Sequence, residues 1–365
     1  MKIGIVTQPL RMNYGGVMQN FALQQALKSL GHFPVTIDPI QLRFKKNFFW
    51  YARLIKRFVF MALGDKSIKC INPEELDRKS RDVHKSFIDS HISYISKEYP
   101  LKSTIIDEEA FEAFIVGSDQ VWRPRYSIYL ENCFLDFTSN KNVIRISYAA
   151  SFGTSKWELN VSQTRMAQGY IKKFKAVSVR ESDGVKLCEE YLNNSSLQVL
   201  DPTMLLSAEQ YRKLYIEEEC VDCQGDVFVY ILDINGRKRS IIDDICNKMG
   251  KKAYYVKHSD FNDYTSIESW IAAFDKADFV ITDSFHGIVF SIIFGKQFIN
   301  ITNNARGLSR ISSLLEMFEI DKNRMIAEEA GLDYDFNKVI DYGKVHEILQ
   351  RKREVSLNFL QEVLR

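Results

Sequence analysis

The sequence predicts an α/β protein with two doubly wound, Rossmann-like domains that face a central cleft. Short apolar, β-branched runs alternate with segments of helical periodicity along the chain. A length of 365 residues suits two domains. We expect an N-terminal domain over 1–200, a C-terminal domain over 201–342, and a terminal helix over 343–365 that packs back across them.

The charge balance of the chain argues against a nucleic-acid-binding protein. The formal net charge is +2 and 45% of the residues are apolar, so we expect no nucleic-acid partner. The start, MKIGIVTQPL, is typical of a first β-strand rather than a signal peptide. We therefore expect a cytoplasmic protein.

The six cysteines are scattered, which argues against a disulfide framework. Cys220 and Cys223 form a CxxC, but there is no second pair at zinc spacing. We expect no metal site and interpret the CxxC as part of an interdomain loop.

The predicted elements follow one another as βα units in both halves. In the first half we expect strands at 2–7, 33–37, 113–116, 143–149 and 176–179, with helices at 17–30 and 73–90. In the second half we expect strands at 226–232, 252–256, 279–282 and 298–301, separated by helices at 240–249, 266–274 and 287–294, with a last helix at 344–364.

Polar residues follow several of these strands, where ligands bind in open parallel sheets. The loop after the first strand places Asn13, Tyr14 and Gly15 at a helix N-terminus. After 113–116 come Asp119, a candidate base toward a sugar hydroxyl, and Gln120, a candidate sugar contact. The alternatives are a tight βα turn at the first loop and an Asx turn or helix cap at the second.

Arg180 and His286 are candidate anion contacts. Arg180 follows a strand, and its planar guanidinium suits carboxylate or phosphate. His286, in TDSFHG, lies at a predicted helix N-terminus, which favours an anion. The alternatives are a surface ion pair of Arg180 with Glu181 or Asp183, and a simple cap by Asp283 or Ser284.

The segment 42–63 combines basic residues with many aromatic ones. It could lie at a membrane surface. An ordinary helix whose aromatic face covers the core is the interpretation that we favour.

Seven motifs in order resemble those of the polysaccharide pyruvyl transferase family: NYGGVMQ, FIVGSDQVW, SYAASFG, VSVRESDG, VLDPTMLL, TDSFHG and RGLSRISSLLEMF. The resemblance covers most of the chain. It implies a fold similar to GT-B glycosyltransferases, phosphoenolpyruvate as donor substrate, and a sugar or lipid-linked oligosaccharide of a surface polysaccharide as acceptor. With it we assign the domain over 1–200 to the acceptor side and the domain over 201–342 to the donor side. It implies no metal or organic prosthetic group. A lipid-linked acceptor would place the protein at the inner membrane face.

By this resemblance His286 matches the family's histidine at the donor phosphate and Arg180 its arginine for the phosphoenolpyruvate anion. Asp119 and Gln120 stand in the SDQ motif, while Asn13, Tyr14 and Gly15 belong to the NYG loop on the cleft. Many members have an arginine where this chain has Ser284. A hydroxyl can still donate to phosphate, and the missing charge could come from Arg306, Arg310 or Lys257.

Two other functions stay open at this point. The same two-domain cleft would suit a glycosyltransferase that uses a nucleotide sugar. A non-catalytic sugar- or phosphate-binding relative is the third possibility.

Overall fold

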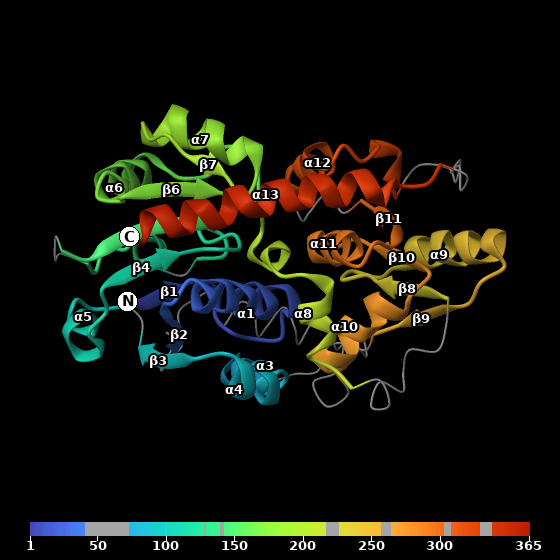
Figure 1. Cartoon of the computed structure of the whole chain (residues 1–365), viewed down its shortest axis with the longest axis horizontal. Helices are drawn as coiled ribbons and strands as arrows, with labels where there is room; N and C mark the ends of the chain where they lie inside the picture. Colours follow the sequence, from blue (N-terminus) through green and yellow to red (C-terminus); the bar gives the residue numbers. More distant parts are fainter. Residues whose placement is uncertain are drawn as a thin grey trace, which may run out of the picture.

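In a computed structural model, the first half of the chain forms one parallel sheet of seven strands. Figure 1 shows this half beside the second half, with α13 (Tyr342–Val363) along both. The structure describes residues 1–40, 73–98, 100–127, 129–138, 142–216, 226–256, 264–302, 308–328 and 338–365. The strand order is β3-β2-β1-β4-β5-β6-β7. The strands are β1 (Lys2–Val6), β2 (Phe33–Ile40), β3 (Tyr94–Glu98), β4 (Ala113–Val116), β5 (Ile144–Ala150), β6 (Ala176–Val179) and β7 (Leu197–Gln198).

The second half forms a parallel sheet of five strands in the order β12-β11-β10-β8-β9. They are β8 (Val227–Tyr230), β9 (Ala253–Tyr255), β10 (Phe279–Thr282), β11 (Gln297–Ile301) and β12 (Met325–Ile326). In both sheets the chain leaves the first strand toward one neighbour and later returns to its other side. These reversals, between β1 and β4 and between β8 and β10, are where doubly wound sheets bind ligands.

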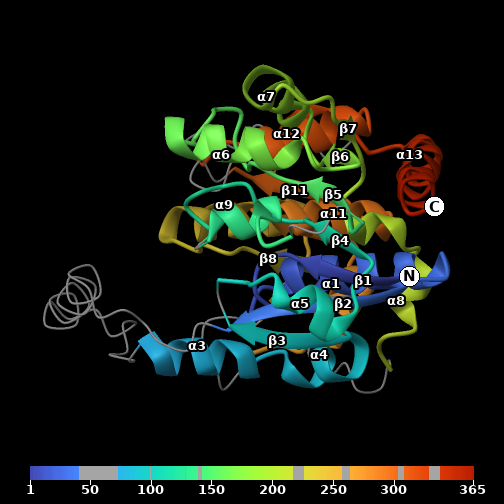
Figure 2. The same cartoon turned by 90° about the vertical axis from the view of Figure 1, so that its left-hand side faces the viewer.

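Helices connect the strands and cover the sheets. They are α1 (Tyr14–Ser29), α3 (Pro73–Asp82), α4 (Lys85–His91), α5 (Thr104–Glu109), α6 (Val161–Ile171), α7 (Ser182–Leu192), α8 (Ala208–Arg212), α9 (Gly236–Met249), α10 (Ile267–Lys276), α11 (Phe285–Ile293), α12 (Leu308–Met317) and α13 (Tyr342–Val363), with short 3-10 turns η1 (Leu130–Phe134), η2 (Pro202–Leu205) and η5 (Lys322–Arg324). Figure 2 shows α6 and α7 beside β6 and β7, with α3 and α4 near β3 at the opposite end of the first sheet.

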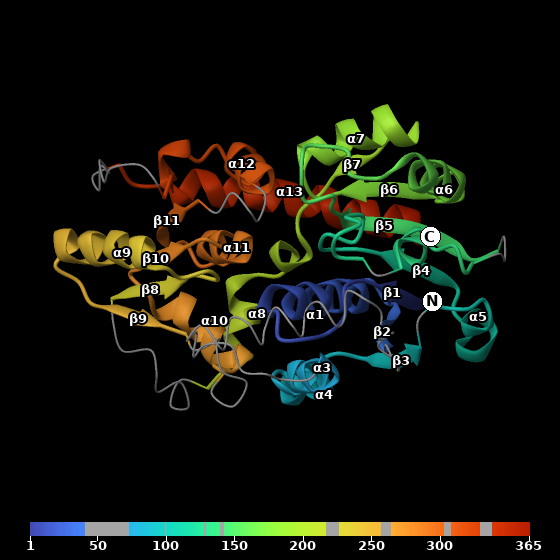
Figure 3. The same ribbon diagram turned by 180° about the vertical axis from the view of Figure 1, so that it is seen from behind.

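Within the part of the chain that the structure describes, one of the three clusters of buried hydrophobic residues spans both halves, and each half has a further cluster of its own. A single cluster of buried residues includes Leu23 of α1, Met204 of η2 and Phe290 of α11. Helix α13 runs along both halves (Figures 1 and 3). It is held to the start of the linker between the two sheets, residues 199–206. The Ser356 hydroxyl accepts from Leu200 N at 3.0 Å, and Arg353 Nε donates to the Met204 carbonyl at 2.9 Å. Joint burial of apolar surface therefore holds the sheets together.

The structure confirms the predicted fold class and corrects several elements. The predicted helix at 73–90 is two helices, α3 and α4, with a break between them. Strands β3, β7 and β12 were not predicted, since β3 is a largely polar edge strand and the other two have two residues each. Helix α1 begins at Tyr14 rather than at Val17, so Tyr14 and Gly15 belong to its first turn. The domain bounds stay a prediction.

Some predictions fall on residues outside the described part of the chain: the segment 42–63, the CxxC of Cys220 and Cys223, Arg306, and Lys257. Among the described residues, none of the helices is both long and apolar enough to span a membrane.

Candidate active site

A cavity of about 500 Å³ opens between the two sheets, at both points where their strand order reverses. Its walls come from the segments that follow β1, β4, β8 and β10, together with α12. The lining residues are Gln8, Pro9, Arg11, Met12, Asn13, Tyr14, Asp119, Gln120, Tyr126, Tyr230, Leu232, Tyr264, Asp283, Ser284, Phe285, His286, Arg310 and Ile311. Of the predicted site residues that the structure describes, this set contains all except Arg180 and Gly15.

His286 lies in the first turn of α11, directly after β10. Its side chain is buried, and its Nε2 atom has no hydrogen-bond partner. Burial lowers the pKa of the imidazole to about 4, although Asp201 raises it, so the ring is neutral at pH 7 in the free protein. Ser284 occupies the N-cap position but makes no side-chain cap hydrogen bond. The alternative in which Ser284 caps the helix is therefore wrong for this turn.

Arg180, at the end of β6, is buried rather than exposed. Its Nη1 donates to Asp201 Oδ2 at 3.0 Å, while its Nε and Nη2 atoms have no hydrogen-bond partner. Glu181 Oε2 lies 3.8 Å from Nε, and Asp119 Oδ1 lies 4.0 Å from Nη2. The alternative of a surface ion pair is wrong, because the main partner is a buried carboxylate on the interdomain linker.

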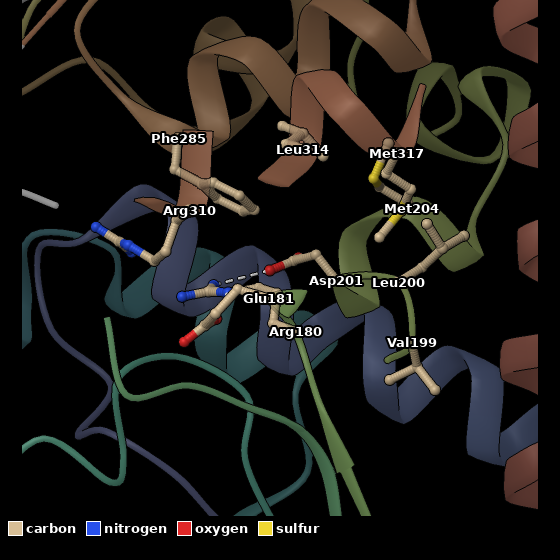
Figure 4. Close-up of a pocket in the computed structure, with 10 residues that line it drawn as sticks. All are labelled: Arg180, Glu181, Val199, Leu200, Asp201, Met204, Phe285, Arg310, Leu314 and Met317. Carbon is tan, nitrogen blue, oxygen red and sulfur yellow. Dashed lines mark hydrogen bonds and ion pairs between the residues drawn. The ribbon is translucent and has the colours of Figure 1, made fainter. Parts of the chain in front are cut away.

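Phe285 brings two arginines together in a small recess beside the cavity (Figure 4). The Arg180 guanidinium lies 4.6 Å from the centre of the Phe285 ring, and that of Arg310 lies 5.7 Å from it. Burial, together with the nearby charge of Arg180, lowers the pKa of Arg310 to about 10. The recess thus holds two guanidinium groups beside the carboxylates of Glu181 and Asp201. A bound anion would add acceptors for the Arg180 donors that have no hydrogen-bond partner.

Asp119 and Gln120 follow β4 in a loop that is tied to neighbouring segments. Asp119 has a φ of +66°, a strained conformation for a residue with a side chain. Its carbonyl accepts from Ser151 N at 3.0 Å, and its carboxylate accepts from Gln120 N at 2.8 Å. Gln120 Oε1 accepts from Arg123 Nη1 at 3.0 Å. The Asp119 side chain therefore lines the cavity on a firmly held turn.

Tyr14 and Asn13 lie where α1 meets the second half. The Tyr14 hydroxyl donates to the Thr265 carbonyl at 2.5 Å, and its ring stacks on Trp270 with ring centres 5.1 Å apart. Burial raises the pKa of Tyr14 far above its usual value, so the phenol stays protonated. Asn13 is the N-cap residue of α1 and makes no side-chain cap hydrogen bond. Tyr14 thus joins the two halves at the cavity wall.

Three buried acidic residues that sequence reasoning did not select support the site. Asp201 accepts from Arg180, as described above. Glu181 Oε1 accepts from Ser151 Oγ, Phe152 N and Gly153 N. Asp283 Oδ1 accepts from Leu232 N at 2.7 Å, and its Oδ2 accepts from Lys238 Nζ at 2.7 Å. The motif VLDPTMLL could have pointed to Asp201, since an aspartate before proline at the end of an apolar run often marks a turn of the chain.

The described part of the chain contains no group of three or more His, Cys, Asp or Glu side chains placed to hold a metal ion. Cys133, Cys188 and Cys246 are buried free thiols.

The chain matches one protein-family model and is similar in fold to solved structures. A family model described as polysaccharide pyruvyl transferase matches residues 13–305. No curated protein matches. Among solved structures, a glycosyltransferase from Rickettsia africae ESF-5 superposes with a TM-score of 0.53 at 13% identity, covering 100% of this chain and 98% of that chain. The UDP-GlcNAc 2-epimerase from Neisseria meningitidis bound to UDP-GlcNAc gives 0.52 at 8% identity, with 100% and 99% coverage. At these identities the two structures show a shared GT-B-like fold.

Proposed function

The chain belongs to the polysaccharide pyruvyl transferase family and is a transferase, and from this premise we propose its reaction. We propose that it transfers the enolpyruvyl group of phosphoenolpyruvate to two hydroxyls of a sugar in a surface polysaccharide precursor, forming a pyruvate ketal. If the precursor is lipid-linked, we expect the chain to work at the inner membrane face, with 42–63 as the contacting segment.

One observation carries the proposal: Arg180 is buried and two of its guanidinium nitrogens have no hydrogen-bond partner. A buried donor without a partner is costly unless a ligand satisfies it. The neighbouring Arg310 guanidinium and the neutral His286 ring belong to the same region. Phosphoenolpyruvate carries a carboxylate and a phosphate on the same carbon, so its charges suit a site with two arginines.

The arrangement also supports a replacement for the arginine that many family members have where this chain has Ser284. Arg310, from α12, places its guanidinium 5.7 Å from the centre of the Phe285 ring and brings a second cation to the recess. We propose that Arg310 replaces the missing charge, while the Ser284 hydroxyl, at the N-terminus of α11, donates to the phosphate.

In the proposed chemistry, the bound anion offsets the charges of Arg180 and Arg310, so that His286 takes up a proton from water. The imidazolium then protonates the methylene carbon of phosphoenolpyruvate. The resulting cationic carbon is attacked by one sugar hydroxyl, whose proton passes to Asp119, and an equivalent proton returns to water from Asp119. A second hydroxyl of the sugar then displaces phosphate and closes the ketal. Over the whole reaction the two hydroxyl protons end on the new methyl group and on the released phosphate, so that the reaction needs no oxidant or other co-reactant.

Thermal unfolding with added ligands tests the donor without knowledge of the acceptor. Phosphoenolpyruvate at a hundredfold excess over its Kd should stabilise the protein by about 2.7 kcal/mol. We expect Arg180→Gln to lose this stabilisation. The matched control is Arg212→Gln, which breaks an exposed ion pair with Asp275 away from the cavity and should keep it.

Other outcomes would contradict the proposal in different ways. Stabilisation by a nucleotide sugar but not by phosphoenolpyruvate would identify a glycosyltransferase instead. Tight binding of phosphoenolpyruvate with no release of phosphate in the presence of sugar acceptors would indicate a binding protein.

A further inference from the structure

The buried carboxylate of Asp201 contacts residues from both halves of the site. Asp201 lies on the linker between β7 and η2. Its Oδ2 accepts from Gln19 Nε2 of α1 at 2.5 Å and from Arg180 Nη1 at 3.0 Å. The same oxygen is 3.8 Å from His286 Nε2. One atom therefore faces the arginine of the first sheet and the histidine of the second.

The other carboxylate oxygen fixes the orientation of Asp201. Oδ1 accepts from Thr203 N at 3.1 Å and from Thr203 Oγ1 at 2.7 Å. The turn at the start of η2 therefore holds the side chain and leaves Oδ2 for the site. Because the guanidinium is planar, its hydrogen bond to this fixed oxygen restrains the direction of the Arg180 donors that have no protein partner.

The charges around His286 come from four segments. Besides Asp201 on the linker, they are Arg180 after β6, Asp119 after β4 and Arg310 on α12. The two carboxylates favour the protonated ring, and the two guanidinium groups oppose it. When an anionic substrate neutralises the guanidinium groups, Asp201 becomes the nearest fixed countercharge that the protein offers to Nε2.

We propose that Asp201 is a positioning residue, which orients Arg180 toward the donor anion and stabilises His286 in its protonated state during proton transfer. This inference rests on the proposed function for its role in catalysis. The interaction between Asp201 and His286 can be tested without any substrate. Burial raises the pKa of Asp201, but His286, Arg180 and the Thr203 hydrogen bonds bring it below the usual value, so Asp201 is ionised where the enzyme would act.

The first test is an NMR titration of the full chain labelled at histidine Cε1, with the His286 signal assigned from the His286→Gln variant. We expect Asp201→Asn to move the His286 titration to lower pH, because a carboxylate that favours the imidazolium is removed. The control is Asp275→Asn, which removes a carboxylate paired with Arg212 and should leave the signal unchanged. An unchanged His286 titration in Asp201→Asn would overturn the proposal.

Gln19→Leu provides a second variant with an effect of opposite sign. It removes a neutral donor from Asp201 Oδ2 and keeps the carboxylate charge. The Asp201 carboxylate should then stabilise the protonated His286 ring more strongly, and the His286 titration should move to higher pH. If Asp201→Asn does not fold, this variant decides the question, and a shift to lower pH would contradict the proposal.

The catalytic role is tested by the pH profile of phosphate release from phosphoenolpyruvate with a sugar acceptor. We expect Asp201→Asn to lower kcat by about a hundredfold and to move the alkaline limb of the profile to lower pH. A purely structural defect would lower kcat without moving that limb. If the wild type releases no phosphate, the proposed function fails, while the NMR titration still reports on the pairing of Asp201 with His286.

Discussion

Gly15 and His286 lie so close that a β-carbon built on Gly15 would be 2.0 Å from His286 Nδ1. Gly15 belongs to the first turn of α1 and His286 to the first turn of α11, so this contact joins the N-terminal ends of two helices from different sheets. A side chain at Gly15 would have to displace the ring. The glycine in the NYGG motif therefore makes room for a side chain of the site.

Gly15→Ala should disable the site more than it harms the fold. We expect it to destabilise the protein by about 1–3 kcal/mol through overpacking. It should lower the rate of phosphate release about a hundredfold, because His286 moves by about 1 Å or more. The matched control is Gly16→Ala, whose new β-carbon would meet Asn13 Nδ2 at 3.4 Å, an ordinary contact. Equal rates in the two variants would contradict this role of Gly15.

Arg310→Gln should weaken donor binding. Loss of a charge-assisted contact costs about 1.5–3 kcal/mol, or roughly a tenfold to hundredfold loss in affinity. Isothermal titration with phosphoenolpyruvate measures this directly. Arg353→Gln is a suitable control, since Arg353 donates to the Met204 and Leu206 carbonyls from α13 and does not line the cavity. Unchanged affinity in Arg310→Gln would exclude Arg310 as the replacement for the missing arginine.

Stability should depend on pH through His286. Its pKa is lowered from 6.5 to about 4, so the unfolded chain binds the proton more readily than the folded one. The resulting stability is fully present above pH 6.5 and is lost as the pH falls toward 4. This group should account for a loss of about 3 kcal/mol over that range. Denaturant unfolding should show a smaller loss for His286→Asn, and parallel curves for the two proteins would contradict this prediction.

His84 should also make the folded protein less stable at low pH. Burial lowers its pKa to about 4 as well, so it adds to the loss of wild-type stability on acidification. The difference between wild type and His286→Asn isolates the part that belongs to the site.

Lys238→Met should be strongly destabilising. Lys238 and Asp283 form an ion pair at 2.7 Å with both side chains almost fully buried. Removing the lysine leaves a buried carboxylate uncompensated, which costs about 3–5 kcal/mol. Lys251→Met is the contrasting variant, because its pair with Asp278 is exposed and should be worth less than about 1 kcal/mol. Urea unfolding compares the two, and similar losses would refute the distinction.

The sequence by itself determined the parallel α/β class and the segments on which the site would lie. Alternation of apolar runs with helical periodicity depends on local spacing, so β4, β6 and β10 were predicted with the bounds that the structure has. Arg180, Asp119 and His286 were selected because each follows such a strand. The residues that follow parallel strands share one edge of their sheet, which brings Asp119 and Arg180 to one edge of the first sheet and His286 to the corresponding edge of the second.

Only the tertiary structure decided which side chains become partners. Local spacing cannot show that Asp201 accepts from Arg180 and Gln19, or that Gly15 leaves room for His286, because these residues are distant in the chain and meet only when both sheets pack. The short strands β7 and β12 likewise exist because a longer neighbour offers hydrogen bonds. Packing of the two sheets on a common core converts separate strand ends into one charged, buried site.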